Sequence, residues 1–304
     1  MNGANTHDEI VSCASVITDE QAKFFLNNGF LILRNIIRGE ELRRLRAAMD
    51  DLTASGSETV REHPDFAYGS GHRTGRSVLR RIEYVIDKAD ECKALLGHPF
   101  ILRSVEKLMG PDYIPTWDSM VLKLPREGIE VPWHRDAGTE CVGDTPIFNV
   151  DYYLDAADED TCVWVIPGSH RWSRAEVDAI VQQRDFHQET AVPALMRPGD
   201  VMFHNILVLH GSPRNGSDKL RRVIYYEFRA AHVEAALGPH IPEYIPLKQR
   251  VLLDCIERRK TTEYIARTEE PYEYQPPAPW NTVVREAASK PKTHRYPHGA
   301  YWRR

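Results

Sequence analysis

Apolar residues recur three and four positions apart in several stretches of the chain, a spacing that predicts amphipathic helices. The first helix begins with a capping-box sequence at Thr18 and ends before Gly29. The others begin at about Gly39, span Pro99 to Met109, and span about Pro246 to Arg267. Helices are therefore expected in the first third of the chain and near its end.

Alternating apolar positions predict β-strands, which are most frequent between residues 117 and 229. In one of them the even positions are apolar, whereas Asn149 and Asp151 alternate with them, so the apolar face is expected to pack on a core. Helices followed by many short strands predict an α+β domain built on a β-sandwich or jelly roll. The expected strands are residues 30–36, 80–86, 147–154, 163–167, 200–210 and 221–229.

The length of 304 residues predicts one elaborated domain, over residues 18–270, because it is short for two independent domains. Residues 1–17 are expected to form a loose N-terminal arm. Residues 55–78 are rich in Gly, Ser, His and charged residues and are expected to form a long loop, a possible lid. The Pro- and aromatic-rich extension 271–304 is expected to pack against the body or against a partner subunit, which would allow a homodimer.

Composition favours a globular protein that acts on small molecules. The apolar fraction is 42%, the charged fraction 27% and the net charge −5, so no basic surplus invites nucleic acid or a membrane surface. The chain shows no signal-peptide pattern and no run of eighteen apolar residues, so we expect a cytoplasmic protein. The cysteines are odd in number and scattered, which predicts reduced thiols: Cys13, Cys92, Cys141, Cys162 and Cys255.

The segment Val131–Asp136 contains a candidate metal site. On a strand, His134 and Asp136 point to the same face and can reach one ion, although His-x-Asp alone also occurs in solvated loops. His210, at the end of an apolar run, is the best supplier of a third ligand. Two His and one carboxylate occupy one face of an octahedral ion and leave three positions open, which is typical of non-haem Fe(II) oxygenases.

Three further motifs follow in order, namely VWVIPGSH at 163–170, RPGD at 197–200 and HGS at 210–212. Together with the helix–strand–helix start and His-x-Asp, this order resembles the phytanoyl-CoA dioxygenase family of Fe(II)/2-oxoglutarate oxygenases. The similarity runs from about Thr18 to Arg229. It implies a double-stranded β-helix (jelly roll, cupin-like) core flanked by helices, with iron held at its mouth.

The resemblance implies a role for individual residues. His134, Asp136 and His210 match the metal triad, and the family places an Arg eleven residues after the distal His, which is Arg221 here. That Arg binds the far carboxylate of 2-oxoglutarate. Its neighbour Arg222 stays open as an alternative, because adjacent residues on a strand face opposite ways.

Other positions match family sites more loosely. Ser212 matches a residue that hydrogen-bonds the co-substrate, while Tyr152 and Met120 lie either beside it or in ordinary core packing. Trp117 and Trp133 are candidates for the substrate wall, together with loop 55–78.

Four more residues have a structural interpretation that we favour over a functional one. His204 shares parity with His210 and is expected to be a satisfied interior residue. His170 fits turn chemistry, and Arg80 or Arg81 fits a solvated strand edge better than a pocket.

The implied activity is oxidation of an unactivated C–H bond with Fe(II), 2-oxoglutarate and O2, releasing succinate and CO2, with hydroxylation as the ordinary outcome. Asp136 argues against halogenation, and the small residues Ala137–Thr139 would leave space beside the iron. The chain lacks a glycine loop or basic cluster for phosphates, which favours a small metabolite of secondary metabolism over a CoA thioester. The alternatives are a cupin-like metalloprotein with non-oxidative chemistry and a non-catalytic jelly-roll binding module.

Overall fold

The computed structural model of the protein describes residues 15–58, 64–136, 143–183, 185–265 and 269–281. The helices of this part are α1 (Asp19–Asn28), α2 (Gly39–Glu58), α3 (Asp90–Leu96), α4 (Pro99–Met109), α5 (Arg174–Val181), α6 (Ala231–Leu237) and α7 (Tyr244–Lys260), with short 3-10 helices at Val85–Asp87 and Ser169–Arg171. The strands are β1 (Phe30–Leu33), β2 (Phe66–Ser70), β3 (Ser77–Glu83), β4 (Tyr113–Lys123), β5 (Val131–His134), β6 (Phe148–Tyr153), β7 (Val163–Val165), β8 (Val192–Ala194), β9 (Val201–Asn205), β10 (His210–Ser212) and β11 (Arg221–Ala230).

The strands form two antiparallel sheets. The larger sheet has the order β1-β9-β6-β11-β4-β3-β2, and the smaller has the order β5-β10-β7-β8. Residues of both sheets line the space between them. This arrangement confirms the predicted α+β class with a double-stranded β-helix core flanked by helices.

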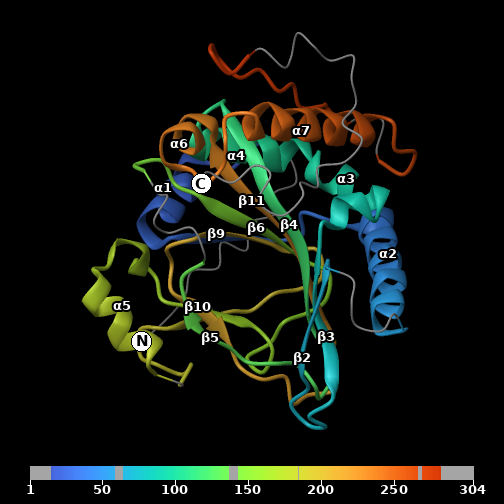
Figure 1. Cartoon of the computed structure of the whole chain (residues 1–304), viewed down its shortest axis with the longest axis vertical. Coiled ribbons are helices and arrows are strands. Elements are labelled where there is room, and N and C mark those ends of the chain that lie inside the picture. The colour runs from blue at the N-terminus through green and yellow to red at the C-terminus, as the bar shows by residue number, and fades with distance from the viewer. Residues whose placement is uncertain (1–14, 59–63, 137–142, 184, 266–268, 282–304) are drawn as a thin grey trace.

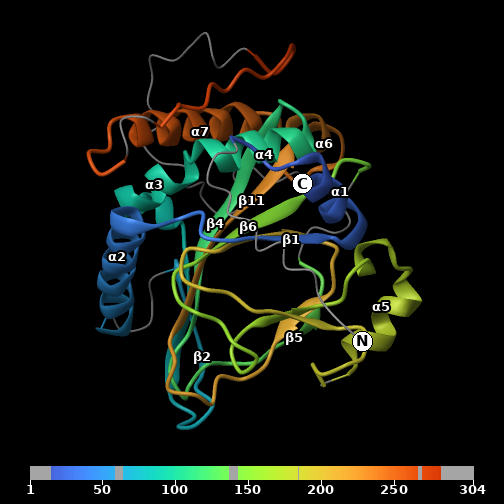
Figure 2. The same ribbon diagram turned by 180° about the vertical axis from the view of Figure 1, so that it is seen from behind.

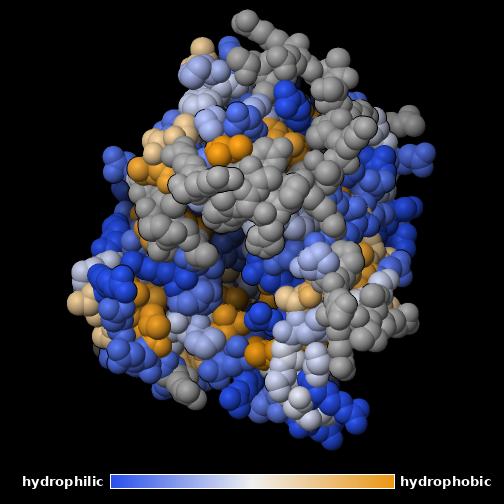
Figure 3. All heavy atoms as spheres, in the orientation of Figure 1, coloured by the Kyte–Doolittle hydropathy of each residue, from blue (hydrophilic) through white to orange (hydrophobic). Residues whose placement is uncertain are grey.

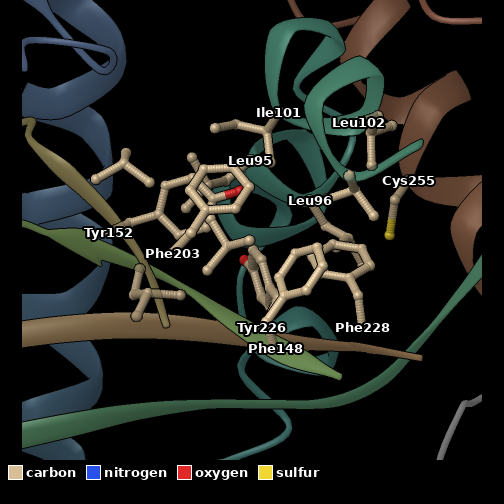
Figure 4. Packing of buried hydrophobic residues seen from close by; sticks show 14 of the residues in the cluster. Leu95, Leu96, Ile101, Leu102, Phe148, Tyr152, Phe203, Tyr226, Phe228 and Cys255 are labelled. Atoms are coloured by element: carbon tan, nitrogen blue, oxygen red, sulfur yellow. The ribbon is translucent and has the colours of Figure 1, made fainter. Parts of the chain in front are cut away.

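Helices cover the outer face of the larger sheet. α4, α6 and α7 lie together along one end of β4, β6 and β11 (Figure 1), and the view from behind shows the same layer (Figure 2). Figure 4 shows the apolar core beneath them, where Tyr152, Phe203 and Tyr226 of the sheet pack with Leu96 of α3 and Ile101 of α4. This face of the sheet is filled, so only the opposite face can contribute to a site.

Strand alternation separates the two faces along β11. Ile224 and Tyr226 are buried in the core beneath the helices. Arg221, Val223 and Tyr225 line the space between the sheets instead. The pleat of one strand therefore places Ile224 and Tyr226 in the core and both Arg221 and Tyr225 in the interior of the jelly roll.

The predicted helices are confirmed, with one shifted boundary. Thr18 and Gln21 form the expected capping box: each side chain accepts from the other residue's backbone N–H, at 3.2 and 2.9 Å. Gly29 ends α1 in the left-handed region at φ 80°, which suits glycine. The last helix runs from Tyr244 to Lys260 rather than from 246 to 267.

The prediction of a single long loop over residues 55–78 is wrong. α2 extends to Glu58, and Phe66–Ser70 forms β2, which pairs with β3. Tyr68 donates a hydrogen bond from its hydroxyl to the carbonyl of Gly56 at 2.6 Å and so joins this hairpin to the helix. Cross-strand pairing and this contact outweigh the turn-like composition of the segment.

The apolar run 200–210 is not one strand but two, in different sheets. Asn205 ends β9: its side-chain oxygen accepts from the Leu207 N–H at 2.9 Å and its carbonyl accepts from the Val208 N–H at 2.9 Å. The resulting turn carries the chain from the larger sheet to the smaller one. His204 and His210 consequently lie on facing sheets.

The described parts of the two terminal segments pack against the domain. Ile17 is buried and its N–H donates to Ser104 Oγ at 3.2 Å, which contradicts a loose arm at that residue. In the C-terminal extension Tyr272 and Tyr274 are buried against Tyr113. The remainder, residues 1–14 and 282–304, lies outside the described part.

Three cysteines of the described part, Cys92, Cys162 and Cys255, are buried free thiols. None of the helices that the structure describes is long and apolar enough to cross a membrane. In the space-filling view the visible face is largely hydrophilic, and hydrophobic residues appear as separate small patches (Figure 3).

Candidate active site

The two histidines of the predicted triad lie side by side in the smaller sheet. His134 ends β5 and is paired in register with His210, the first residue of β10. Their ring centroids are 4.2 Å apart. Asp136 follows β5 and is held by its backbone N–H, which donates to the Ile206 carbonyl at 2.9 Å. One ligand atom from each of the three residues lies within 4.8 Å of the others.

The hydrogen bonds of the histidines leave the correct nitrogen free for a metal. Nδ1 of His134 lies 2.8 Å from the Pro132 carbonyl, and Nδ1 of His210 lies 3.0 Å from the Val208 carbonyl. A carbonyl can only accept, so both Nδ1 atoms carry the proton and both Nε2 atoms keep a lone pair. Each Nε2 lies 3.6 Å from Oδ1 of Asp136, so three donor atoms converge.

The second oxygen of Asp136 is occupied by other side chains. Oδ2 accepts from Asn149 Nδ2 at 2.9 Å and lies 3.1 Å from His204 Nε2. His204 Nδ1 in turn lies 2.8 Å from Asp151 Oδ2. These partners leave Oδ1 directed at the histidines, as groups around a metal ligand commonly do.

His204, Asn149 and Asp151 were not expected to belong to the site. His204 was interpreted as a satisfied interior residue, which describes its hydrogen bonds but not its contact with Asp136. The available signal was the alternation in β6, where Asn149 and Asp151 alternate with apolar positions; the shared parity of His204 and His210 carries none, because a turn separates their strands. Sequence alone does not show that β6 and β9 are neighbours.

Electrostatics favour a bound cation. Burial, reinforced by the neighbouring His134, lowers the pKa of His210 to about 3, so this ring is neutral. Burial would raise the pKa of Asp136, but the surrounding imidazoles hold it well below its ordinary value. Burial also opposes the charge on His204, yet Asp151 and Asp136 raise its pKa to about 10. Burial opposes the charge on His134 as well, but the adjacent Asp136 raises its pKa above the ordinary value, so a metal ion would replace a proton at this ring.

A cavity of about 220 Å³ extends from the triad between the two sheets. Arg221 lines this cavity, is 3% exposed and donates to the Thr161 carbonyl at 2.8 Å. Arg222 points to the other side of β11 and pairs with Asp155 at 2.8 Å and Asp50 at 2.5 Å. Of the two candidates for a 2-oxoglutarate ligand, only Arg221 reaches the cavity.

Ser212, Arg80 and Arg81 also line the cavity. The solvated strand edge is therefore wrong for Arg81, which is half-buried on an inner strand of the sheet, whereas Arg80 is exposed to solvent as expected. Trp117 is half-buried and lies behind Arg81, whose guanidinium carbon is 5.9 Å from its ring centre. The same guanidinium lies 5.1 Å from the ring of Tyr225, so the two aromatic rings hold Arg81 in place.

Besides Trp117, which lies behind Arg81, three predicted contact residues do not reach the cavity. Tyr152 and Met120 are buried in the core between the larger sheet and the helices (Figure 4 for Tyr152). Trp133 packs on Phe186 in a separate core, and its Nε1 donates to the Asp185 carbonyl at 2.9 Å. Each stands on the outward face of its strand, next to a residue that faces inward.

The inward neighbours take those places at the cavity wall. Tyr153 and Val121 line the cavity beside Tyr152 and Met120, and His134 beside Trp133.

His170 has the structural role that was expected, with Nε2 3.2 Å from the Leu26 carbonyl. The small residues 137–139 lie outside the described part.

The donor set fits an iron ion, and the cavity fits a carboxylate co-substrate. Two neutral imidazoles and one carboxylate form the face that non-haem iron oxygenases use. A jelly roll with this triad and a buried guanidinium deeper in the same cavity belongs to that class of enzyme.

A family model described as "Phytanoyl-CoA dioxygenase (PhyH)" matches residues 25–223. The protein belongs to this family, as its sequence motifs predict. Peroxisomal phytanoyl-CoA dioxygenase of Rattus norvegicus is 23% identical over 230 residues, covering 69% of this chain and 68% of that protein. The protein is accordingly a dioxygenase that uses Fe(II), 2-oxoglutarate and O2. The cupin-like and binding-module alternatives are set aside.

Solved structures show the same fold. AviO1 from Streptomyces viridochromogenes Tue57 is 27% identical with a TM-score of 0.60, covering 72% of this chain and 96% of that one. EvdMO1 is 28% identical with a TM-score of 0.58, covering 69% of this chain. The match spans 49% of EvdMO1, about half of its length.

Proposed function

We propose that the protein hydroxylates an unactivated C–H bond of a small metabolite, with iron held by His134, Asp136 and His210. Arg221 and Ser212 bind the far carboxylate of 2-oxoglutarate. One observation carries this proposal: three metal-donor atoms converge in a cavity that also contains a buried guanidinium. Arg221 has no carboxylate within ion-pair distance among the described residues.

The contribution of the chain is orientation and exclusion of water. Iron and 2-oxoglutarate, when bound, supply the oxidising power and release succinate and CO2. The Nδ1–H bonds of His134 and His210 set the direction of both Nε2 lone pairs. The substrate wall fixes which C–H bond is nearest to the metal, and a bound substrate would exclude water from the partly exposed side at His134.

Hydroxylation is favoured over halogenation because Asp136 occupies the position that a halide would need. The lack of a glycine loop or basic cluster for phosphates in the sequence favours a small metabolite over a CoA thioester. A role in secondary metabolism is part of this proposal. Mass spectrometry of candidate metabolites incubated with the enzyme under ¹⁸O2 tests it, and one incorporated oxygen atom is the expected result.

Anaerobic titration tests the metal and co-substrate roles. Fe(II) and 2-oxoglutarate added together should produce a weak visible charge-transfer band that disappears in His134→Ala. His72→Ala, an exposed histidine away from the cavity, should behave like the wild type. Absence of the band, and of succinate formation in air, from the wild-type protein would support non-oxidative metal chemistry instead.

We further propose a cytoplasmic enzyme and a homodimer formed through the C-terminal extension. Tyr274 donates to the Tyr113 carbonyl at 2.7 Å, so the first part of the extension packs on its own domain. A chain that ends at residue 281 keeps this packing and removes the rest of the extension. Light scattering of the full chain and of a chain ending at residue 281 tests this: a dimer that becomes a monomer supports it, and an unchanged mass contradicts it.

A further inference from the structure

Lys123 is a second buried basic side chain in the wall of the same cavity. It is the last residue of β4 and is paired in register with Arg221 of β11. It is 1% exposed, and both residues line the cavity. Directly opposite residues on one face of a sheet have Cβ atoms roughly 5 Å apart, so the two basic groups start from neighbouring positions.

Neither basic group has an acidic partner in the part of the chain that the structure describes. Lys123 Nζ donates to the carbonyls of Ile129 at 2.9 Å and Ser212 at 3.3 Å, and to that of Pro213. Arg221 donates to the Thr161 carbonyl, and its Nε has no partner. Glu130 and Asp151 line the same cavity, but among the described residues neither carboxylate forms an ion pair with Lys123 or Arg221.

We propose that Lys123 is a second ligand of the distal carboxylate of 2-oxoglutarate, which it shares with Arg221. The inference rests on the use of 2-oxoglutarate and adds a residue that the family spacing did not indicate. A guanidinium binds a carboxylate as a fork, and an ammonium acts as a point charge beside it. Two such groups make binding depend strongly on the distal carboxylate and select against 2-oxo acids that lack one.

The titration of Lys123 agrees with this geometry. Burial, followed by the neighbouring Arg221, lowers the pKa of Lys123 to about 6, while Glu130 and the Cys162 thiol act weakly in the opposite direction. An incoming carboxylate favours the charged form of the amine. Binding of 2-oxoglutarate near pH 7.5 should therefore take up a proton at this site.

A purely structural role for Lys123 is the competing explanation, because its amine joins β4 to segments 129 and 212–213. The two roles differ in which ligands they affect. Oxalate chelates the same metal positions as the keto acid end of 2-oxoglutarate but has no distal carboxylate. If Lys123 is a ligand, its replacement weakens the binding of 2-oxoglutarate alone. If its role is structural, its replacement weakens the binding of both chelators.

The test is calorimetric titration of the Mn(II)-loaded enzyme with 2-oxoglutarate and with oxalate. Lys123→Met and Lys123→Gln should each raise the Kd of 2-oxoglutarate at least about tenfold and change that of oxalate less than twofold. Lys219→Met, an exposed lysine two residues before β11, is the control and should match the wild type. An unchanged Kd for 2-oxoglutarate, or an equal loss for both ligands, would overturn the proposal.

If the Lys123 variants fail to fold, a measurement on the wild type alone still tests the proposal. Titrations in two buffers of different ionisation enthalpy give the number of protons taken up. The proposal expects uptake with 2-oxoglutarate and none with oxalate, and equal uptake with both would contradict it. A wild-type enzyme that binds oxalate but not 2-oxoglutarate would contradict the co-substrate assignment as well, and so is distinguishable from failure of Lys123 alone.

Discussion

Nε2 of His204 lies 3.1 Å from Oδ2 of Asp136, on the carboxylate oxygen that does not face the two histidines of the triad. The ring of His204 is itself held by Asp151 at 2.8 Å. This chain of contacts sets the orientation of Asp136 before any metal binds. His204 is therefore a positioning residue for the metal site.

Replacing His204 should weaken metal binding without removing a ligand. We expect His204→Ala to lower the affinity for Fe(II) or Mn(II) by about 10- to 100-fold, because Asp136 then loses one of the two groups that orient it. Calorimetric titration of the metal-free protein measures this, with His72→Ala as the matched control. Wild-type affinity in His204→Ala would show that Asn149 alone suffices to hold the carboxylate.

Arg221 and Arg222 should give opposite results although they are adjacent. Arg221→Gln should raise the 2-oxoglutarate requirement at least tenfold, since it removes a charge from the cavity. Arg222→Gln should instead lower the free energy of unfolding by about 3 kcal/mol, because it leaves buried Asp155 without its closest partner. Steady-state kinetics and denaturant unfolding of both variants distinguish the two. The reverse pattern would refute the observed orientation of β11.

A substitution of Met120 tests whether this residue of β4 faces the core and not the cavity. Met120→Ala should lower the free energy of unfolding by about 2–5 kcal/mol, because the residue is fully buried in the core beneath the helices. The folded variant should bind 2-oxoglutarate with unchanged affinity. Val121→Ala, at the cavity wall, is the companion variant and should alter binding more than stability. A loss of 2-oxoglutarate affinity confined to Met120→Ala would restore the original prediction.

The stability of the ligand-free protein should rise with pH through Lys123. Its pKa falls from 10.5 in the unfolded chain to about 6 in the folded protein. Between these values the unfolded state binds more protons, so the free energy of unfolding increases with pH by up to about 1.4 kcal/mol per unit. Urea unfolding at pH 6.5 to 9 should show this slope in the wild type and a smaller one in Lys123→Met. Equal slopes would mean that Lys123 stays protonated.

Sequence spacing predicted the His134–Asp136 pair and the start of α1 because each depends on residues close together in the chain. A two-residue separation on a strand places His134 and Asp136 on one face, and a capping box defines the start of α1. The family motif then located His210 and Arg221, whose positions depend on a long connection that spacing alone does not describe.

The errors concern the side of a strand and its neighbours. Tyr152 and Met120 were selected because they match family positions near the co-substrate, but both take the alternative role of core packing. The neighbouring Tyr153 and Val121 face the cavity instead. The contact of His204 with Asp136 depends on β9 lying beside β6, which is a property of sheet order and not of local sequence. The hairpin β2–β3 was missed because its stability comes from pairing rather than composition.

The most direct test of the central claim is a crystal structure of the Fe(II) complex with 2-oxoglutarate, grown without O2, with anomalous data at the iron edge. The account predicts one iron peak within bonding distance of His134 Nε2, His210 Nε2 and an Asp136 oxygen, and a distal carboxylate beside Arg221. Iron bound elsewhere, or a peak that only one of these three side chains reaches, would contradict it.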